Sequence, residues 1–82
     1  MKIAIIGLGY VGIQLATGLG RQYATMGFDL DAAKVAAYEA GEDPTGEASN
    51  AQLADANHLG FTTEPDDLRG YDVYIVAVPT PV

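Results

Sequence analysis

The feature that most constrains this chain is a glycine pattern that separates a short apolar run from a helical pattern. Residues 3–6 are all apolar, and Gly7, Gly9 and Gly12 follow them with the spacing G-x-G-x-x-G. This order of strand, glycine turn and helix is typical of a dinucleotide-binding unit. The alternative is an ordinary strand-to-helix turn, because glycine-rich turns are common. We expect the turn to present backbone N–H groups to a pyrophosphate at the helix N-terminus.

Each glycine has its own predicted task, and an acidic residue follows at the spacing that a dinucleotide-binding unit requires. Gly7 makes the tight turn, Gly9 lets backbone approach a phosphate, and Gly12 lets the helix pack closely on the sheet. Asp29 lies seventeen residues after Gly12, at the end of the second predicted strand. A carboxylate at this place accepts hydrogen bonds from the ribose hydroxyls of NAD and repels the 2′-phosphate of NADP. We therefore predict NAD as the cofactor.

Two neighbouring residues leave alternatives open. Asp29 could instead cap the following helix, although Asp31 suits that role better because it directly precedes the helical pattern. Lys34 lies one turn into the helix and could reach the adenine end of the cofactor. A solvated surface lysine is an equally good interpretation of its position.

The pattern of the whole chain predicts an α/β fold: a partial Rossmann fold whose parallel sheet has the order 3-2-1-4, with flanking helices. We expect residues 1–82 to be the N-terminal part of an NAD-binding Rossmann domain, truncated after strand four. Turn formers and capping residues mark the boundaries. The predicted strands are 2–6, 23–29, 59–62 and 72–78, and the predicted helical segments are 10–20, 32–40, 50–57 and 63–68.

The first predicted helix should have one core face and one water face. Its apolar residues recur at four-residue spacing. The predicted core face holds Val11, Leu15 and Leu19, with Gly12 and Ala16 beside them, and the predicted water face holds Gln14, Thr17 and Arg21.

Other candidate residues are interpreted as structural. His58 is a single histidine before a strand, and we expect a structural or surface role. Three acidic residues near a predicted helix start are more simply a charge cluster than a metal site, and three aromatic residues in or beside strands are expected to pack. These residues are Glu64, Asp66 and Asp67, and Phe61, Tyr71 and Tyr74.

Composition excludes several classes of function. The net charge of −7 argues against nucleic acid and against an anionic membrane surface as partners. Phosphate capture would therefore rest on backbone N–H groups. The absence of cysteine excludes a disulfide framework and a thiol nucleophile from these residues. No segment reaches the roughly 18 apolar residues of a membrane span, so we predict a soluble, cytoplasmic protein.

The last residues leave strand four on the side where cofactors bind. Val78, Pro79 and Thr80 continue the most apolar stretch, and proline makes this exit rigid. The Thr80 hydroxyl should lie near the nicotinamide half of the cofactor. The outer edge of strand four carries no charged residues that would prevent pairing with another strand, and we expect this edge to pair with a second copy of the chain.

Three stretches together resemble a known family. IIGLGYVG, GFDLD and DVYIVAVPTP are similar to the N-terminus of the nucleotide-sugar 6-dehydrogenases. GEDPTGEAS and HLGFTTEPDDLRGYD resemble the UDP-N-acetylhexosamine branch more than the UDP-glucose branch. Enzymes of this family make the uronic acids of capsule and O-antigen polysaccharides. The resemblance implies an enzyme that oxidises the sugar C6 alcohol to a carboxylate with NAD.

The resemblance also implies site residues. It places NAD contacts at Tyr10 and Val11, the adenosine side at Asp29 and Lys34, and the pyrophosphate–ribose side at Pro79 and Thr80. The family's catalytic cysteine, lysine and asparagine, and its UDP-sugar domain, come later than residue 82, so no catalytic residue is expected here. The complete predicted cofactor set is Gly7, Gly9, Tyr10, Val11, Gly12, Asp29, Lys34, Val78, Pro79 and Thr80.

The chain departs from the family at two places. Gln14 stands where the family often has proline, and Thr25 with Met26 replaces a more β-branched pair, which predicts a less regular second strand. Other identities also remain open: another NAD-dependent dehydrogenase of the hydroxyacid or 6-phosphogluconate type, a nucleotide-sensing regulatory module of potassium-transport proteins, or a truncated or designed half-domain.

Overall fold

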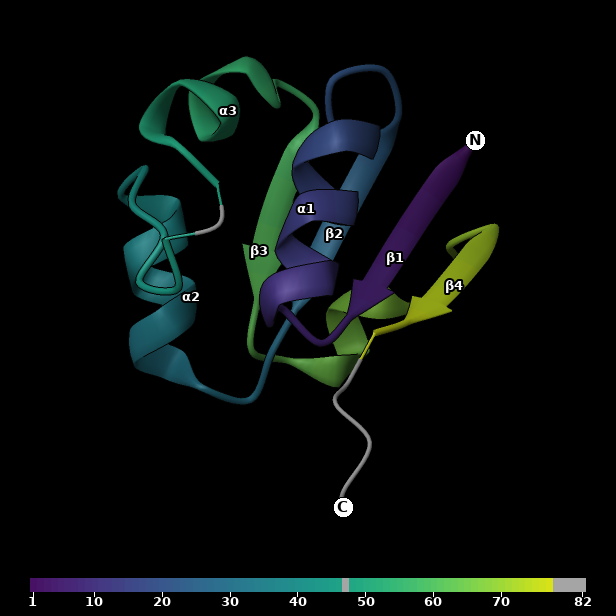
Figure 1. The fold of residues 1–82 in the computed structure, drawn as a ribbon. Helices are drawn as coiled ribbons and strands as arrows, with labels where there is room; N and C mark the ends of the chain where they lie inside the picture. The colour runs from purple at the N-terminus through teal and green to yellow at the C-terminus, as the bar shows by residue number, and fades with distance from the viewer. Residues whose placement is uncertain (47, 78–82) are drawn as a thin grey trace.

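A computed structural model of the protein describes residues 1–46 and 48–77 as a parallel sheet with helices (Figure 1). The strand order is β3-β2-β1-β4, and every pair of neighbouring strands is parallel. The predicted fold class and strand order are therefore confirmed. The elements are β1 (Lys2–Ile6), α1 (Tyr10–Leu19), β2 (Ala24–Phe28), α2 (Ala32–Glu39), α3 (Asn50–Asp55), β3 (Leu59–Thr62), the 3-10 helix η1 (Pro65–Leu68) and β4 (Val73–Val76).

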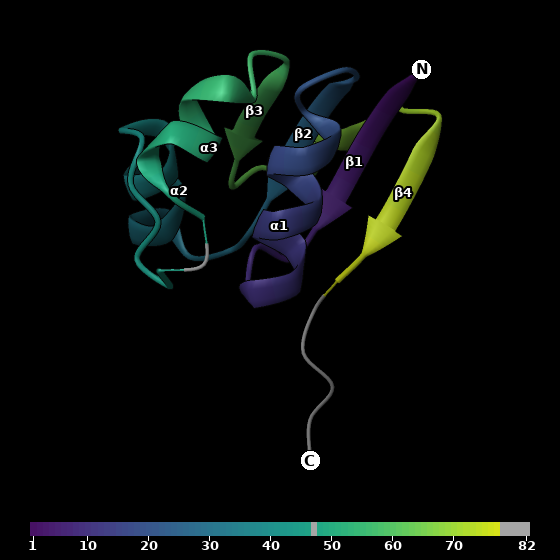
Figure 2. The same cartoon turned by 45° about the horizontal axis from the view of Figure 1, so that its top comes forward.

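Strand β1 is the centre of the fold. It pairs with β2 on one side and with β4 on the other. Ile3, Ala4 and Ile5 are all buried, so the strand is covered on both faces, as an apolar central parallel strand should be. Helices α1, α2 and α3 lie on one face of the sheet, and η1 lies on the other (Figures 1 and 2).

The predicted faces of α1 are wrong in part. Val11 is 65% exposed and Leu15 is 36% exposed, whereas Thr17, expected to face water, is buried. The hydroxyl of Thr17 donates to the Ile13 carbonyl oxygen at 3.0 Å, which satisfies its polar group inside the protein. The buried residues of α1 are Gly12, Ile13, Ala16 and Thr17.

Close packing at Gly12 explains why α1 buries a different face from the predicted one. A Cβ atom built on Gly12 would lie 1.7 Å from the carbonyl oxygen of Gly7, so only a glycine can face the turn at this point. Because Gly12 must face the turn, Ala16, one helical turn later, faces inward as well, and Ile13 and Thr17 beside these two residues complete the buried face. Four-residue apolar spacing alone does not contain this information.

The helix starts agree with the sequence. Asp31 is the N-cap of α2, and its carboxylate accepts a hydrogen bond from the Lys34 N–H group at 3.1 Å. Ser49 and Gln52 form the predicted capping box at the start of α3. Local side-chain chemistry therefore determines where both helices begin.

Strand β2 is more regular than predicted. Residues 24–28 pair in continuous register with β1, and residues 25–28 also pair with β3. Thr25 is buried, and its hydroxyl donates to the Tyr23 carbonyl oxygen at 2.8 Å. Pairing on both sides overrides the weak strand preference of this sequence, so the expected irregularity is wrong.

The residues interpreted as structural occupy structural positions. His58 is exposed, and its backbone links β2 to the end of α1 through Thr25 and Gly20. Asp66 and Asp67 lie in the first turn of η1, as expected for a helix-start cluster. Phe61 stacks on Tyr38 with ring centroids 5.4 Å apart.

Tyr71 and Tyr74 are less buried than the predicted packing role suggests. The Lys2 ammonium lies 4.7 Å from the ring centroid of Tyr71. Tyr74 is 49% exposed, and its hydroxyl donates to the Leu68 carbonyl oxygen at 2.6 Å. This bond ties β4 to the end of η1.

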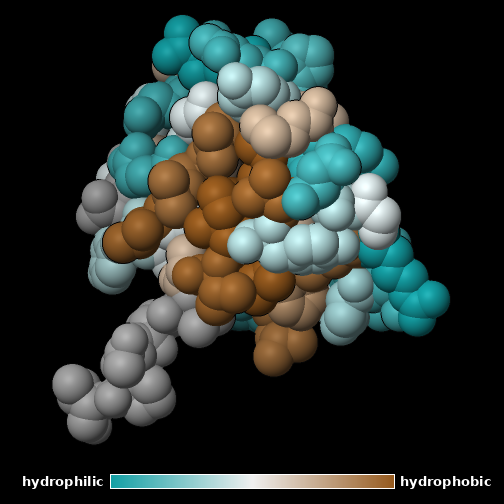
Figure 3. Space-filling model, turned by 90° about the vertical axis from the view of Figure 1, so that its right-hand side faces the viewer, coloured by the Kyte–Doolittle hydropathy of each residue, from teal (hydrophilic) through white to brown (hydrophobic). Residues whose placement is uncertain are grey.

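An apolar area lies on the side of the molecule where β4 is found (Figure 3). Exposed apolar side chains on β4 and α1 include Val76, Val11 and Leu15. Within the described residues, β4 pairs only with β1, so its other edge carries no strand. In the part of the chain that the structure describes, no helix is long and apolar enough to cross a membrane.

Candidate cofactor site

The candidate site lies where β1 ends and α1 begins. Gly7 has a φ of +102°, a left-handed conformation that favours glycine, and its N–H group donates to the Phe28 carbonyl oxygen at 2.8 Å. Gly9 is the N-cap of α1, and a Cβ atom built on it would have no atom within 4 Å. The structural tasks predicted for Gly7 and Gly12 are confirmed. The space at Gly9 fits the close approach of a ligand.

The residue between the two glycines is held on three sides. The Leu8 N–H group donates to Oδ2 of Asp29 at 3.0 Å, and the Leu8 carbonyl oxygen accepts a hydrogen bond from the Tyr38 hydroxyl at 2.7 Å. The Leu8 side chain is fully buried and lies against Gly27 of β2. The glycine turn, residues 7–9, is therefore tied to both β2 and α2.

The first turn of α1 offers the donors for an anionic group. Its first intrahelical hydrogen bond runs from the Ile13 N–H group to the Gly9 carbonyl oxygen at 3.0 Å. The N–H groups of Tyr10, Val11 and Gly12 make no hydrogen bond within the described residues, and no side chain caps the helix. Free N–H groups and the positive helix end together favour a phosphate. These residues therefore fit a pyrophosphate.

Asp29 supplies a carboxylate beside the turn. Its Oδ1 atom accepts from the Asp31 N–H group at 2.9 Å, and its Oδ2 atom lies 3.6 Å from the Lys34 ammonium. Burial alone would raise the pKa of Asp29, but the N–H groups of Asp31 and Leu8 and the charge of Lys34 hold it below its usual value. The group is thus ionised at neutral pH. A carboxylate has about four lone-pair sites, so acceptor capacity remains for ribose hydroxyls.

Lys34 and Asp29 lie together, as the resemblance implied, but they also pair with each other. The sequence left two interpretations of Lys34 open, a contact with adenosine and a solvated surface lysine. The ion pair with Asp29 adds a third. Lys34 neutralises a partly buried carboxylate, since its side chain is 25% exposed and paired. Contact of either residue with a cofactor stays a prediction.

Two hollows lie at the site, one lined by Asp29 and the other by its partner Lys34. The first measures ≈ 120 Å³ and is mainly apolar; its lining residues are Ile6, Gly7, Phe28, Asp29 and Leu30. The second measures ≈ 380 Å³ and lies between the start of α2 and the loop that follows it. Its lining includes Tyr10, Lys34, Pro44 and Thr45. An apolar wall with a few polar groups is the usual form of a cofactor site.

The predicted contacts at Val78, Pro79 and Thr80 lie outside the described residues. Ala77 is the last described residue, and its N–H group donates to the Ile6 carbonyl oxygen at 2.8 Å. Its Cβ atom is 3.5 Å from the position that a Cβ atom on Gly12 would take. The end of β4 therefore lies beside the glycine turn.

Sequence reasoning missed Tyr38 and Asp43. Tyr38 was only a residue of a predicted helix, and no sequence pattern links it to Leu8, thirty positions away. Asp43 lies in a polar loop, where the Asp-Pro pair could have indicated a side-chain-stabilised turn. Its carboxylate accepts hydrogen bonds from the backbone of Thr45 and Ala48 at 2.8 and 2.7 Å.

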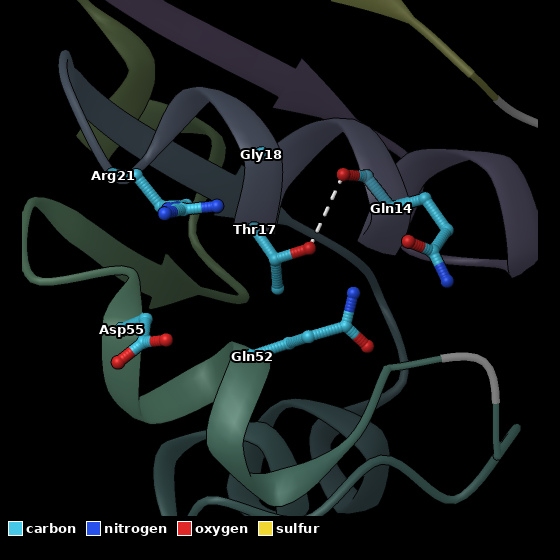
Figure 4. Close-up of a pocket in the computed structure, with 6 residues that line it drawn as sticks. All are labelled: Gln14, Thr17, Gly18, Arg21, Gln52 and Asp55. Carbon is cyan, nitrogen blue, oxygen red and sulfur yellow. Dashed lines mark hydrogen bonds between the residues drawn. The ribbon is translucent and has the colours of Figure 1, made fainter.

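A separate polar hollow of ≈ 100 Å³ lies between α1 and α3 (Figure 4). Thr17 and Gln52 face each other across it, and the Thr17 hydroxyl also lies 3.2 Å from the Gln14 carbonyl oxygen. None of the residues that line this hollow belongs to the predicted cofactor set. We assign it no part in cofactor binding.

A parallel β-α-β unit whose glycine turn opens a helix, with an ionised aspartate at the end of the second strand, defines a dinucleotide-binding Rossmann unit. The particular kind follows from comparison with known proteins. The chain belongs to the UDP-glucose/GDP-mannose dehydrogenase family, whose NAD binding domain matches residues 1–82. The predicted family and the predicted cofactor, NAD, are confirmed.

Named relatives agree with this family. The chain is 42% identical over 82 residues to UDP-N-acetyl-D-glucosamine 6-dehydrogenase of Pseudomonas aeruginosa, covering 100% of this chain and 19% of that protein. It is 35% identical over 81 residues to protein CapL of Staphylococcus aureus, with 99% and 19% covered. This chain therefore spans about a fifth of the length of these relatives.

Solved structures show the same fold. UDP-D-ManNAc dehydrogenase from Pyrococcus horikoshii superposes with a TM-score of 0.89 at 26% identity, over 100% of this chain and 21% of that one. A ternary complex of GDP-mannose dehydrogenase from Pseudomonas aeruginosa gives a TM-score of 0.85 at 31% identity, over 99% and 20%. The sheet and helices of this chain thus match one part of larger dehydrogenases.

Proposed function

We propose that this chain is the NAD-binding segment of a UDP-N-acetylhexosamine 6-dehydrogenase that serves capsule or O-antigen polysaccharide synthesis. The observation that carries the proposal is the match of the whole chain to a UDP-N-acetyl-D-glucosamine 6-dehydrogenase at 42% identity. In the proposed reaction the sugar C6 alcohol loses two hydrides in two steps, and water supplies the second carboxylate oxygen. NAD, when bound, is the hydride acceptor.

The residues of this chain would bind and orient the cofactor. In this proposal the free N–H groups of Tyr10 and Val11 hold the pyrophosphate, with Gly7, Gly9 and Gly12 shaping the turn. Asp29 accepts hydrogen bonds from the adenosine ribose, and Lys34 supports it by its charge. Val78, Pro79 and Thr80 complete the set on the nicotinamide side. Chemistry at C6 and binding of the UDP-sugar would come from residues beyond position 82.

An activity assay of the longer parent protein tests the proposal. UDP-N-acetylglucosamine, UDP-N-acetylmannosamine and UDP-glucose are each supplied with NAD, and NADH formation is followed by absorbance. We expect two NADH per sugar oxidised with an N-acetylhexosamine substrate, and no turnover by the 82-residue chain alone. Turnover with UDP-glucose only would contradict the assigned substrate. NADH formation by the short chain would contradict its assignment as a binding segment.

We further propose that the 82-residue chain associates with a second copy through β4. Tyr74 and Val76 are 49% and 65% exposed, and among the described residues no strand pairs with the outer edge of β4, which leaves its backbone groups available to another strand. Light scattering at tens of micromolar should show a mass above that of the monomer, and a Val76→Lys variant should reduce it. A clean monomer for the wild-type chain would refute this proposal.

The cytoplasmic location that we expect from the sequence stays a prediction.

A further inference from the structure

Tyr38 is a buried residue whose polar atom lies against the glycine turn. Its side chain is 2% exposed, its ring stacks on Phe61, and its hydroxyl donates to the Leu8 carbonyl oxygen at 2.7 Å. Burial raises the pKa of the Tyr38 phenol, and the nearby Asp43 carboxylate raises it further. The phenol therefore stays protonated, and remains a hydrogen-bond donor, at neutral pH.

The same tyrosine lies against a second element, the Asp43 loop, which we define as residues 42–46 and 48. Asp43 organises this loop through one carboxylate. Its Oδ1 atom accepts from the N–H group and the hydroxyl of Thr45, at 2.8 and 2.7 Å, and its Oδ2 atom accepts from the Ala48 N–H group. Ala48 is buried in the same core cluster as Tyr38 and Leu8.

The Asp43 loop forms part of the wall beside the candidate site. Pro44 and Thr45 line the hollow of ≈ 380 Å³ that also contains Tyr10 and Lys34. The loop is thus linked to Leu8 in two steps: Ala48, which Asp43 holds, shares a core cluster with Tyr38, and the Tyr38 hydroxyl bonds to the Leu8 carbonyl oxygen. Leu8 is in turn bonded to Asp29.

We propose that Tyr38 is a positioning residue for NAD binding, which holds the glycine turn in its binding geometry and couples it to the Asp43 loop. The inference rests on the cofactor assignment in the proposed function but not on the sugar substrate. Its physical basis is preorganisation. A turn whose central residue is fixed at both its N–H and its C=O group loses less conformational freedom when a pyrophosphate binds beside it.

Tyr38→Phe in this chain tests the proposal, because it removes one oxygen and keeps the stacked ring. Tyr74→Phe is the matched control, since the Tyr74 hydroxyl also donates to a backbone carbonyl, that of Leu68, away from the glycine turn. Two readouts are needed: amide hydrogen exchange of Leu8 and Gly9 without cofactor, and the NAD dissociation constant by calorimetry. Thermal unfolding of both variants records the loss of stability that any lost hydrogen bond causes.

We expect Tyr38→Phe to speed exchange at Leu8 and Gly9 and to weaken NAD binding by about three- to tenfold, the equivalent of one neutral hydrogen bond. Tyr74→Phe should lose similar thermal stability and change neither readout. An Asp43→Ala variant should also weaken NAD binding, and its effect should shrink when Tyr38 is already phenylalanine.

Unchanged NAD affinity in Tyr38→Phe, or an equal loss in Tyr74→Phe, would overturn the proposal. Faster exchange at Leu8 with unchanged affinity would also overturn it, since Tyr38 would then be structural only. If wild-type protein binds NAD but the parent oxidises no UDP-N-acetylhexosamine, the proposed reaction fails and the role of Tyr38 stands. If wild-type protein fails to bind NAD, both the positioning role and the cofactor assignment fail.

Discussion

The Asp29 carboxylate accepts a hydrogen bond from the Leu8 N–H group at 3.0 Å and so joins the end of β2 to the middle of the glycine turn. The residue that the sequence marks as the ribose acceptor is therefore also a structural anchor of the phosphate turn. Any change at Asp29 will act on the cofactor and on the fold together. Experiments at this position need a measurement that separates the two effects.

Asp29→Ala should weaken NAD binding by about tenfold to a hundredfold, because hydrogen bonds that involve a charged group contribute about 1.5–3 kcal/mol each. NADP binding should fall less, since repulsion of its 2′-phosphate is also removed. Titration of both cofactors gives the ratio of affinities, and an unchanged ratio would show that Asp29 does not face the ribose. Asp31→Ser is the control: it removes a nearby charge but keeps a side-chain oxygen for capping α2.

Asp29→Ala is also expected to lower the stability of the fold. The N–H groups of Leu8 and Asp31 both lose their acceptor, which predicts a loss of about 1–3 kcal/mol in the free energy of unfolding. Urea denaturation measures this loss. Because stability affects both cofactors equally, the NAD/NADP ratio remains the specific readout.

Gly12→Ala should be severely destabilising, although alanine is normally the better helix former. Its Cβ atom would lie 1.7 Å from the Gly7 carbonyl oxygen, so α1 or the turn must move. Overpacking of this kind lowers the free energy of unfolding by about 3 kcal/mol or more. Gly18→Ala is the matched control in the same helix, with no atom within 4 Å of the new Cβ. It should stabilise the protein by roughly 0.5–1 kcal/mol. Equal unfolding midpoints for the two variants would refute the close approach.

The corrected face of α1 is tested by two lysine substitutions. Thr17→Lys places a charge in a buried position and should cost several kcal/mol, about 3 or more. Leu15→Lys, at a position that is 36% exposed, should cost less than about 1.5 kcal/mol. The four-residue apolar spacing predicts the reverse order. Unfolding midpoints of the two variants decide between them.

Acid should destabilise the protein through Asp29 and Asp43. Burial acts to raise both pKa values, but hydrogen bonds from Leu8, Asp31, Thr45 and Ala48 hold each pKa below its usual value. The unfolded state therefore binds more protons near pH 4, so stability rises with pH in that range. The contribution should be complete above about pH 5 and lost as pH falls through the folded-state pKa values, below about 4.

Unfolding free energy measured between pH 3 and pH 7 checks this dependence. Asp43→Asn should lower stability at pH 7 and flatten the slope below pH 5, because one of the two titrating groups is gone. A slope identical to that of the wild-type chain would show that Asp43 does not contribute. Glu42→Gln is a suitable control, since Glu42 is exposed and its side chain makes no hydrogen bond in the described structure.

Much of this protein follows from its sequence, because the determining interactions are local. The apolar run and Gly7 define the end of β1, and Asp31 and the Ser49–Gln52 pair define the starts of α2 and α3. The alternation of strand and helix segments predicts a parallel sheet. Right-handed crossovers then leave few strand orders. Fold class and strand order were predictable on these grounds, and the family was predictable from the resemblance of several stretches to known members.

Tertiary structure alone decided the rotation of α1 and the bonding of the glycine turn. The glycine pattern predicts the close packing of Gly12, but helical spacing does not show that Thr17, rather than Leu15, shares its buried face. Tyr38 and Asp29 reach Leu8 from thirty and twenty-one positions away. Such bonds depend on how the sheet and helices pack, and packing is a property of the folded chain as a whole.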